Sequence, residues 1–124
     1  MLSEIKRWLD QSKEELDTAV ISFSAEKWFA AAFWSQQAAE KALKALYLKE
    51  YKELMKVHDL VYLARKLNLP EEIINYCINL NRIYIETRYP DAGGKIPAKK
   101  FSKADARNII KIASEIIKWV EKKL

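Results

Sequence analysis

Apolar residues recur every three or four positions along most of the chain, which is the spacing of amphipathic helices. Ser24 and Ser102 stand before two of these stretches as N-cap residues, and Asp105 follows Ser102 at capping-box spacing. Five helices are predicted in this way, at about residues 4–22, 25–49, 58–67, 70–88 and from 102 onward. We therefore predict an all-α fold, an antiparallel bundle of about five helices.

The segment between the fourth and fifth helices is the largest break in this pattern. Tyr89–Phe101 holds both glycines and two of the three prolines, so it is predicted to be a loop. Elsewhere the 124 residues show neither a linker nor a repeat, and 50% of the side chains are hydrophobic, so one core can form. We expect a single domain over residues 1–124, and so few glycines and prolines argue against an all-β fold.

Positive charge is concentrated in the last third of the chain. Residues 1–88 carry thirteen basic and thirteen acidic side chains, whereas residues 89–124 carry nine basic and four acidic ones, which accounts for the net charge of +5. A localised basic surface attracts nucleic acid, a nucleotide or an acidic partner protein. Ordinary solubility charge on a lysine-rich surface is the alternative interpretation.

Neither metal nor membrane chemistry is expected. A single Cys and a single His cannot form a Cys-rich or multi-His metal site within one subunit, and no cofactor motif is present. The chain has no run of about 18 to 20 apolar residues, and its charged N-terminus differs from a signal peptide. We expect a cytoplasmic protein without a membrane span, metal or cofactor.

One face of the second predicted helix combines aromatic and polar side chains. At about 100° per residue, its polar members fall on a single arc: Gln36, Gln37, Glu40, Lys41 and Lys44. Phe29 and Phe33 lie on the same arc one or two turns earlier, which is unusual for a solvated face. This pattern indicates a groove or subunit interface that ends in a polar network. The alternative is a solvated face on which Glu40 and Lys44 form a helix-stabilising pair.

Three segments together resemble the signature of the HEPN domain family: Gln36–Leu46, Val57–Leu60 and Thr87–Asp91. The resemblance covers the whole chain and implies a small all-α bundle that pairs as a homodimer. Many HEPN proteins are encoded beside a minimal nucleotidyltransferase and work with it as a toxin–antitoxin system. Others are metal-independent ribonucleases, with an Arg followed four to six residues later by a His, and with the two copies meeting across the dimer cleft.

The ribonuclease motif of that family is not found in this sequence. His58 is the only histidine, no Arg precedes it at the required spacing, and no His follows Arg88. Acid–base cleavage of RNA needs a group that titrates near neutral pH, which Arg does not supply. The sequence therefore favours a non-catalytic or degenerate partner of a nucleotidyltransferase. The alternative is an active metal-independent ribonuclease toxin that uses His58 and Arg88.

Several residues are candidates for binding a nucleotide or an RNA phosphate. Arg88, beside Tyr89 at the end of the fourth helix, offers a guanidinium to an anion. Lys95 follows a pair of glycines whose backbone amides can approach a phosphate, and a solvated loop is the alternative. His58 is either a phosphate contact or a structural residue at a helix start. The candidate set is Gln37, Glu40, Lys44, His58, Arg88, Tyr89 and Lys95.

The second and fourth helices are both apolar enough to pack together. That packing would bring the guanidinium of Arg88 within reach of the Glu40 carboxylate, a pairing that suits the forked geometry of arginine. We therefore expect Glu40 and Lys44 to face Arg88, Tyr89 or His58 across a cleft, rather than bulk solvent.

Overall fold

Five α-helices and one 3-10 helix make up the computed structural model, which describes residues 2–91 and 94–124. In chain order they are α1 (Leu2–Ser24), α2 (Trp28–Tyr51), α3 (Leu60–Lys66), α4 (Glu71–Arg88), η2 (Pro97–Lys99) and α5 (Lys103–Lys123). No strand occurs in these described ranges, so the predicted all-α class is confirmed. No helix among the same residues is long and apolar enough to cross a membrane.

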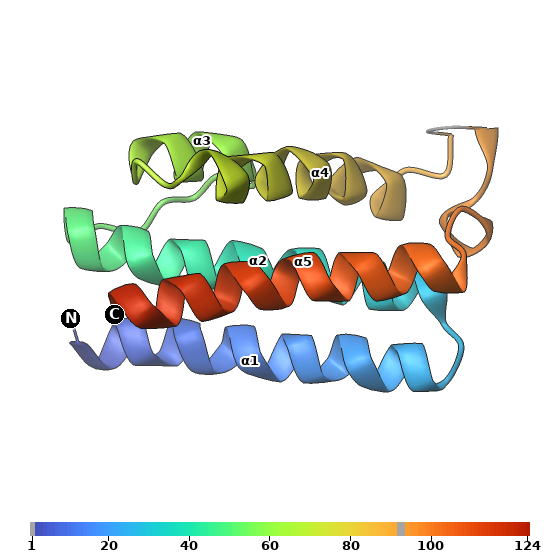
Figure 1. Cartoon of the computed structure of the whole chain (residues 1–124), viewed down its shortest axis with the longest axis horizontal. Coiled ribbons are helices and arrows are strands. Elements are labelled where there is room, and N and C mark those ends of the chain that lie inside the picture. Colours follow the sequence, from blue (N-terminus) through green and yellow to red (C-terminus); the bar gives the residue numbers. More distant parts are fainter. Residues whose placement is uncertain (1, 92–93) are drawn as a thin grey trace.

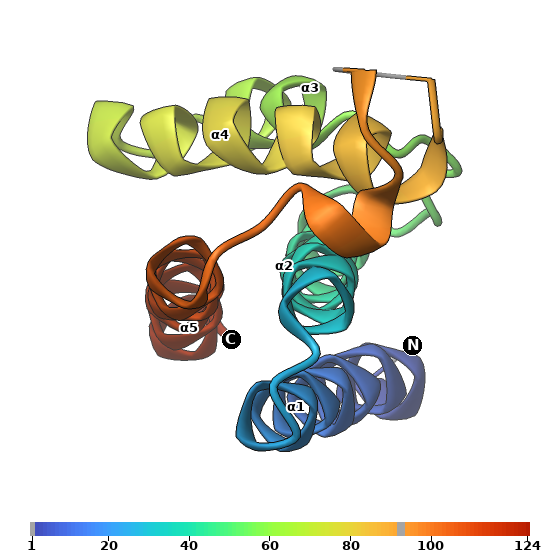
Figure 2. The same ribbon diagram turned by 90° about the vertical axis from the view of Figure 1, so that its right-hand side faces the viewer.

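Helix α2 is the centre of the bundle, because it packs against each of the other four α-helices. α1, α2 and α5 lie side by side, and α1 runs in the opposite direction to the other two (Figure 1). α3 and α4 form a second layer, in which α4 crosses the long helices obliquely (Figure 2). The loop after α4 and η2 returns the chain to the start of α5 beside α2.

Small residues on α2 let its neighbours approach closely. Ala31, Ala38, Ala42 and Ala45 have no exposed surface, and the hydroxyl of Ser12 in α1 donates to the Ala38 carbonyl at 2.6 Å. The apolar stripe of α5 faces the same core and is buried: Ile109, Ile112, Ala113, Ile116 and Val120. The close approach of α1, α2 and α5 thus follows from the alanines of one helix and the branched residues of another.

The boundary between α1 and α2 differs from the prediction. Ser24 is the last residue of α1 and does not cap α2, whose N-cap position is Lys27 and has no side-chain hydrogen bond. The amides of Ala25 and Lys27 instead bond back to carbonyls of α1, and Glu26 adopts a left-handed conformation with φ of 60°. This tight turn provides hydrogen-bond donors for the last carbonyls of α1, and α2 therefore begins later in the sequence than predicted.

The start of α3 also differs from the prediction, with consequences for the only histidine. Asp59 is the N-cap, and its side chain accepts a hydrogen bond from the Tyr62 amide at 3.1 Å. A carboxylate satisfies this free amide well, so the helix begins at Leu60. His58 therefore lies outside α3, in the segment that leads from α2, and does not open a helix.

The start of α5 agrees with the prediction. Ser102 Oγ accepts from the Asp105 amide at 3.1 Å, and the Asp105 carboxylate accepts from the Ser102 amide at 3.0 Å. Both arms of the capping box are thus formed, and they satisfy two backbone amides that have no partner within the helix.

Replacing Ser102 with alanine removes one arm of this box. We expect Ser102→Ala to lower the free energy of unfolding by about 1 kcal/mol. Ser102→Asp, which keeps an acceptor at the N-cap, should remain close to wild type. Urea denaturation followed by circular dichroism measures both variants. An alanine variant as stable as wild type would show that the cap contributes nothing.

Candidate functional site

Three of the five side chains on the polar arc of α2 are covered by protein, and Gln37 and Lys41 are half-buried. Gln36, Glu40 and Lys44 have 0%, 5% and 7% of their surface exposed, because α3, α4 and the segment before α3 lie over this face. This burial excludes the interpretation of the arc as a solvated face. A buried charge is costly unless it is paired and hydrogen-bonded, so the contacts of these three side chains decide what the face can do.

Glu40 is the hub of the covered network. Its Oε2 atom accepts from Lys44 Nζ at 3.0 Å and lies 3.0 Å from His58 Nδ1, and its Oε1 accepts from Gln36 Nε2 at 3.3 Å. Burial alone would raise the pKa of Glu40, but hydrogen bonds from Lys44 and His58, with the charge of Lys44, hold it below its ordinary value. The carboxylate is therefore ionised at neutral pH.

An ionised carboxylate can only accept hydrogen bonds, and this determines the orientation of His58. Nδ1 therefore carries the proton that is shared with Glu40, and this contact does not use Nε2. The His58 side chain is 59% exposed, and its ring stacks on Tyr84 with centroids 5.1 Å apart. The exposed imidazole is thus held in one orientation by a buried acid and an aromatic ring.

Asp59 and Asn81 hold the His58 segment against α4. The amide nitrogen of Asn81 donates to Asp59 Oδ1 at 2.7 Å, and its oxygen accepts from the Leu60 backbone at 2.9 Å. The hydrogen bond from Asn81 is the largest cause that lowers the pKa of Asp59. These contacts tie the start of α3 to the middle of α4 and so place His58 beside Tyr84.

Arg88, at the end of α4, is held over the same tyrosine. Its Nη2 donates to Gln37 Oε1 at 2.7 Å and its Nη1 to the Tyr84 carbonyl at 3.1 Å. The guanidinium carbon lies 3.8 Å from the centre of the Tyr84 ring and 4.6 Å from that of Phe33. Burial lowers the pKa of Arg88, while the charge of Glu40 acts in the opposite direction.

The prediction for the contacts of Glu40, Lys44 and Arg88 is partly wrong. Glu40 does face a residue of the predicted set, His58, and both Glu40 and Lys44 are screened from bulk solvent. The guanidinium, however, is hydrogen-bonded to Gln37 and forms no ion pair with Glu40. Lys44 already provides the positive charge next to that carboxylate, so the neutral amide one turn away receives the guanidinium.

The exposed edge of this cluster is hollowed. A depression of about 270 Å³ is lined by His58, Asp59, Asn81, Tyr84 and Ile85. We call the exposed parts of His58, Tyr84 and Arg88 the His–Tyr–Arg surface. It offers a cation, an imidazole nitrogen and an aromatic ring, which suit an oxyanion or a phosphate carried on a planar base.

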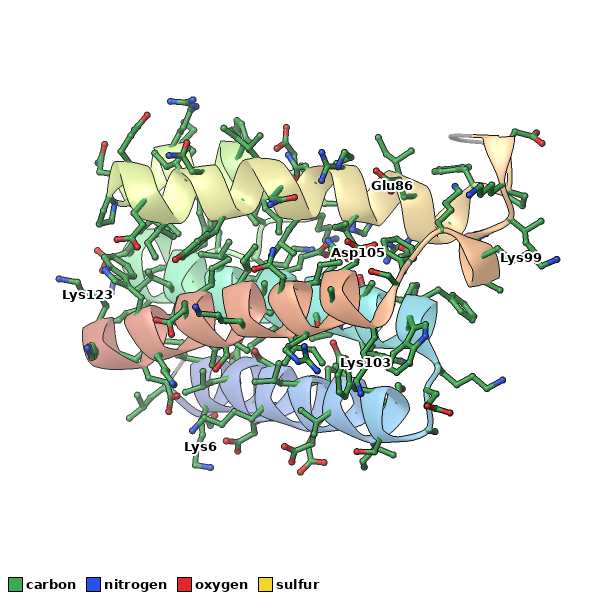
Figure 3. All side chains as sticks on the ribbon, turned by 45° about the vertical axis from the view of Figure 1, so that its right-hand side comes forward. Lys6, Glu86, Lys99, Lys103, Asp105 and Lys123 are labelled. Carbon is green, nitrogen blue, oxygen red and sulfur yellow. The ribbon has the colours of Figure 1, made fainter. Side chains whose placement is uncertain are left out.

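Two candidates from the sequence lie apart from these contacts. Tyr89 is 55% exposed, and Lys95 is exposed in the loop before α5. Lys99 and Lys103 extend outward near the start of α5 (Figure 3). Lys100 instead caps α4, because its ammonium donates to the carbonyls of Glu86 and Tyr89 at 3.1 Å each.

The interpretation of the glycine pair and Lys95 as a phosphate loop stays a prediction, because Gly93 lies outside the described residues. The basic residues of the last third are spread along the loop and α5. In the described part of the chain, no group of three or more His, Cys, Asp or Glu side chains is placed to hold a metal ion.

Sequence reasoning missed Tyr84 and Asn81 as members of the cluster, whereas it had placed Phe33 on the same face of α2. Tyr84 stands one turn before Arg88 in α4, and Asn81 stands a further three residues earlier, so both lie on the helix face that ends at the arginine. This spacing is a signal that could have placed them beside Arg88. Nothing in the local pattern linked them to His58, because that contact joins two distant segments.

Two solved structures are similar to the chain over almost its whole length. The crystal structure of TT1696 from Thermus thermophilus has a TM-score of 0.90 and 31% identity, and the match covers 97% of this chain and 98% of that one. The crystal structure of ST0689, an archaeal HEPN homologue, has a TM-score of 0.83 and 30% identity, with 96% of each chain covered. No curated protein matches the sequence.

The family model agrees with these structural similarities. The HEPN domain model matches residues 5–123, a range that contains the Glu40 network, His58 and Arg88. The similarity to ST0689, which is described as a HEPN homologue, leads to the same assignment. The chain belongs to the HEPN domain family.

Proposed function

We propose that this HEPN protein is a non-catalytic, homodimeric partner of a nucleotidyltransferase in the cytoplasm. In this proposal it binds a nucleotide or an RNA phosphate at the His–Tyr–Arg surface. One observation carries the phosphate-binding part: Arg88 is held only by neutral acceptors, the amide of Gln37, the carbonyl of Tyr84 and the hydroxyl of Thr87. Its positive charge is therefore not cancelled by a directly paired carboxylate among the described residues.

The distribution of charge inside the cluster supports this proposal. Glu40 and Lys44 form an ion pair in which each side chain is about nine-tenths buried, so their charges largely cancel. Arg82, six residues before Arg88 in the same helix, is instead paired with Glu86 at 3.2 Å. Nε of Arg88 has no hydrogen bond within the described part of the chain, so this group can donate to a phosphate oxygen.

An exposed apolar stripe on α4 supports the homodimer. Ile78, Ile85 and Tyr89 are 52%, 50% and 55% exposed, and their spacing of seven and four residues places them on one helix face. Tyr62 of α3, the neighbouring helix, is 43% exposed. A second copy of the chain would cover this surface under two-fold symmetry. The nucleotidyltransferase partner is inferred from membership of the HEPN family alone.

A second candidate function is a metal-independent ribonuclease. The hydrogen bond between Glu40 and His58 Nδ1 favours it, because a carboxylate that orients an exposed imidazole is a recurring arrangement in acid–base catalysis. Arg88 would then stabilise the charge of the phosphate in the transition state. His58 precedes Arg88 in the chain, which is the reverse of the order in the family motif.

Arg88→Gln should weaken the binding of a short fluorescent single-stranded RNA about tenfold or more, since one charge-assisted phosphate contact is lost. The salt dependence of binding should also become shallower by about one phosphate contact. Fluorescence anisotropy measures both quantities. Arg82→Gln is the matched control, because it removes the same charge from an arginine already paired with Glu86. Equal weakening by both variants would indicate only general attraction to net charge.

Light scattering coupled to gel filtration should give twice the chain mass of 14.5 kDa. Ile85→Asp should produce a monomer, because it places a charge in the centre of the apolar stripe of α4. Ile21→Asp, on α1, makes the same change at a side chain that is 69% exposed and should leave the dimer intact. A wild-type mass near 14.5 kDa at micromolar concentration contradicts the homodimer.

Purified wild-type protein should not cleave RNA at a useful rate. Positioned acid–base catalysis contributes typically about 100- to 10,000-fold, and this chain lacks the Arg–His spacing with which the family supplies it. A gel assay without metal ions on wild type and on His58→Ala tests this expectation. Cleavage by wild type that is lost in His58→Ala would replace the non-catalytic proposal with the ribonuclease.

A further inference from the structure

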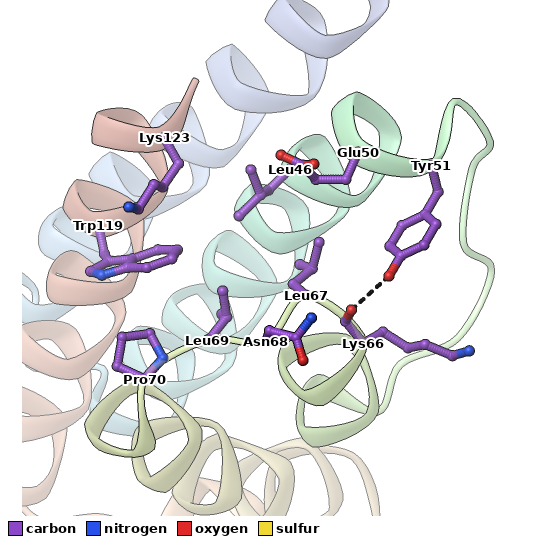
Figure 4. A pocket seen from close by; sticks show the side chains of 10 residues that line it. All are labelled: Leu46, Glu50, Tyr51, Lys66, Leu67, Asn68, Leu69, Pro70, Trp119 and Lys123. Carbon is purple, nitrogen blue, oxygen red and sulfur yellow. Dashed lines mark hydrogen bonds between the residues drawn. The ribbon is translucent and has the colours of Figure 1, made fainter.

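A second hollow lies at the end of the bundle where α2 and α5 finish. It encloses about 590 Å³ and shares no lining residue with the His–Tyr–Arg surface. Figure 4 shows it between the last turns of α2 and α5 and the connection from α3 to α4. Of the residues that line it, only Leu46 belongs to the three HEPN signature segments. The proposed phosphate binding does not involve this hollow.

The walls of this hollow combine polar and apolar side chains, and the apolar ones lie together. Leu46 and Leu69 are almost fully buried, and the half-buried indole of Trp119 closes the side formed by α5 (Figure 4). Leu67 and Pro70 complete the apolar lining. The volume lies within the range of about 300 to 1,000 Å³ that is typical of small-molecule sites. The apolar part of the lining therefore suits a ligand with a compact apolar body.

One edge of the hollow carries negative charge next to its apolar side chains. Glu50 lines the hollow and forms no ion pair with any described residue. The last turns of two long helices, α2 and α5, also end here, and the C-terminal end of a helix carries partial negative charge. The Tyr51 hydroxyl already donates to the Lys66 carbonyl at 2.7 Å, so that acceptor is occupied (Figure 4).

Ammonium groups of the protein already occupy positions around this end. Lys49 Nζ donates to the Lys123 carbonyl at 2.6 Å, and Lys123 Nζ lies 5.1 Å from the centre of the Trp119 ring. The side chain of Lys66 leads away from the hollow, and its ammonium lies over Tyr62 (Figure 4). The indole face thus attracts a cation, and the ammonium over it belongs to Lys123, the last residue of α5. A ligand cation that binds there would take the place of this ammonium.

We propose that this hollow binds a small organic cation, an ammonium on a compact apolar or aromatic body. The apolar body lies against Leu46, Leu67 and Pro70. Its ammonium lies between the Trp119 ring and the Glu50 carboxylate, in place of the ammonium of Lys123. This inference is independent of the proposed phosphate binding, since the two sites share no residue.

Three probes of one shape and different charge test the proposal on the full chain: 2-phenylethylamine, 2-phenylethanol and 3-phenylpropionate. Isothermal titration and ligand-observed NMR should show that the amine binds best. Tighter binding of 3-phenylpropionate would indicate an anion site formed by the lysines. Equal binding of 2-phenylethanol would indicate a purely apolar site. Either result, or no binding of the amine, overturns the proposal.

Variants then locate the cation. Glu50→Gln should weaken binding of the amine by roughly fivefold, whereas Glu14→Gln, an exposed acid on α1, should not change it. Lys123→Gln removes the competing ammonium and should strengthen binding, an effect that a merely structural role of Lys123 would not produce. Arg88→Gln should have no effect. Loss of binding in Arg88→Gln, or no change in Glu50→Gln, would place the amine elsewhere and overturn the proposal.

Discussion

The buried carboxylate of Glu40 is the constraint on which the arrangement of the candidate site depends. A desolvated charge is tolerated only with partners at hydrogen-bond distance, and Lys44, Gln36 and His58 supply them from within α2 and from the segment before α3. The ion pair with Lys44 is local to one helix. The contact with His58 joins residues 18 positions apart, so the network holds the second layer of the bundle over α2.

The same constraint separates two kinds of charge. The positive charge of Lys44 is used inside the protein to neutralise Glu40, whereas the charge of Arg88 is stabilised by an amide, a carbonyl and two aromatic rings. Neutral acceptors orient a guanidinium without cancelling its charge. The exposed edge of the cluster therefore remains positive, although the polar arc beneath it contains an acid.

Membership of the HEPN family accounts for the fold, whereas the chemistry of the candidate site depends on its own residues. The two similar structures cover nearly all of this chain at 30% and 31% identity, so the helical scaffold tolerates extensive change. In this chain the histidine and the arginine come from separate segments and meet at Tyr84. The hollow at the far end is built from helix ends, and its chemistry can therefore vary independently of that cluster.

The sequence by itself determined the features that depend on neighbours three or four residues apart: the helical class, the Ser102–Asp105 box and the polar arc of α2. It did not reveal the end of α1, because the backbone bonds around Glu26 compete with the cap offered by Ser24. Only the tertiary structure selected Gln37 as the partner of Arg88, 51 residues away. Such a choice depends on how α4 crosses α2 and on which buried charge is already neutralised, and local periodicity contains neither.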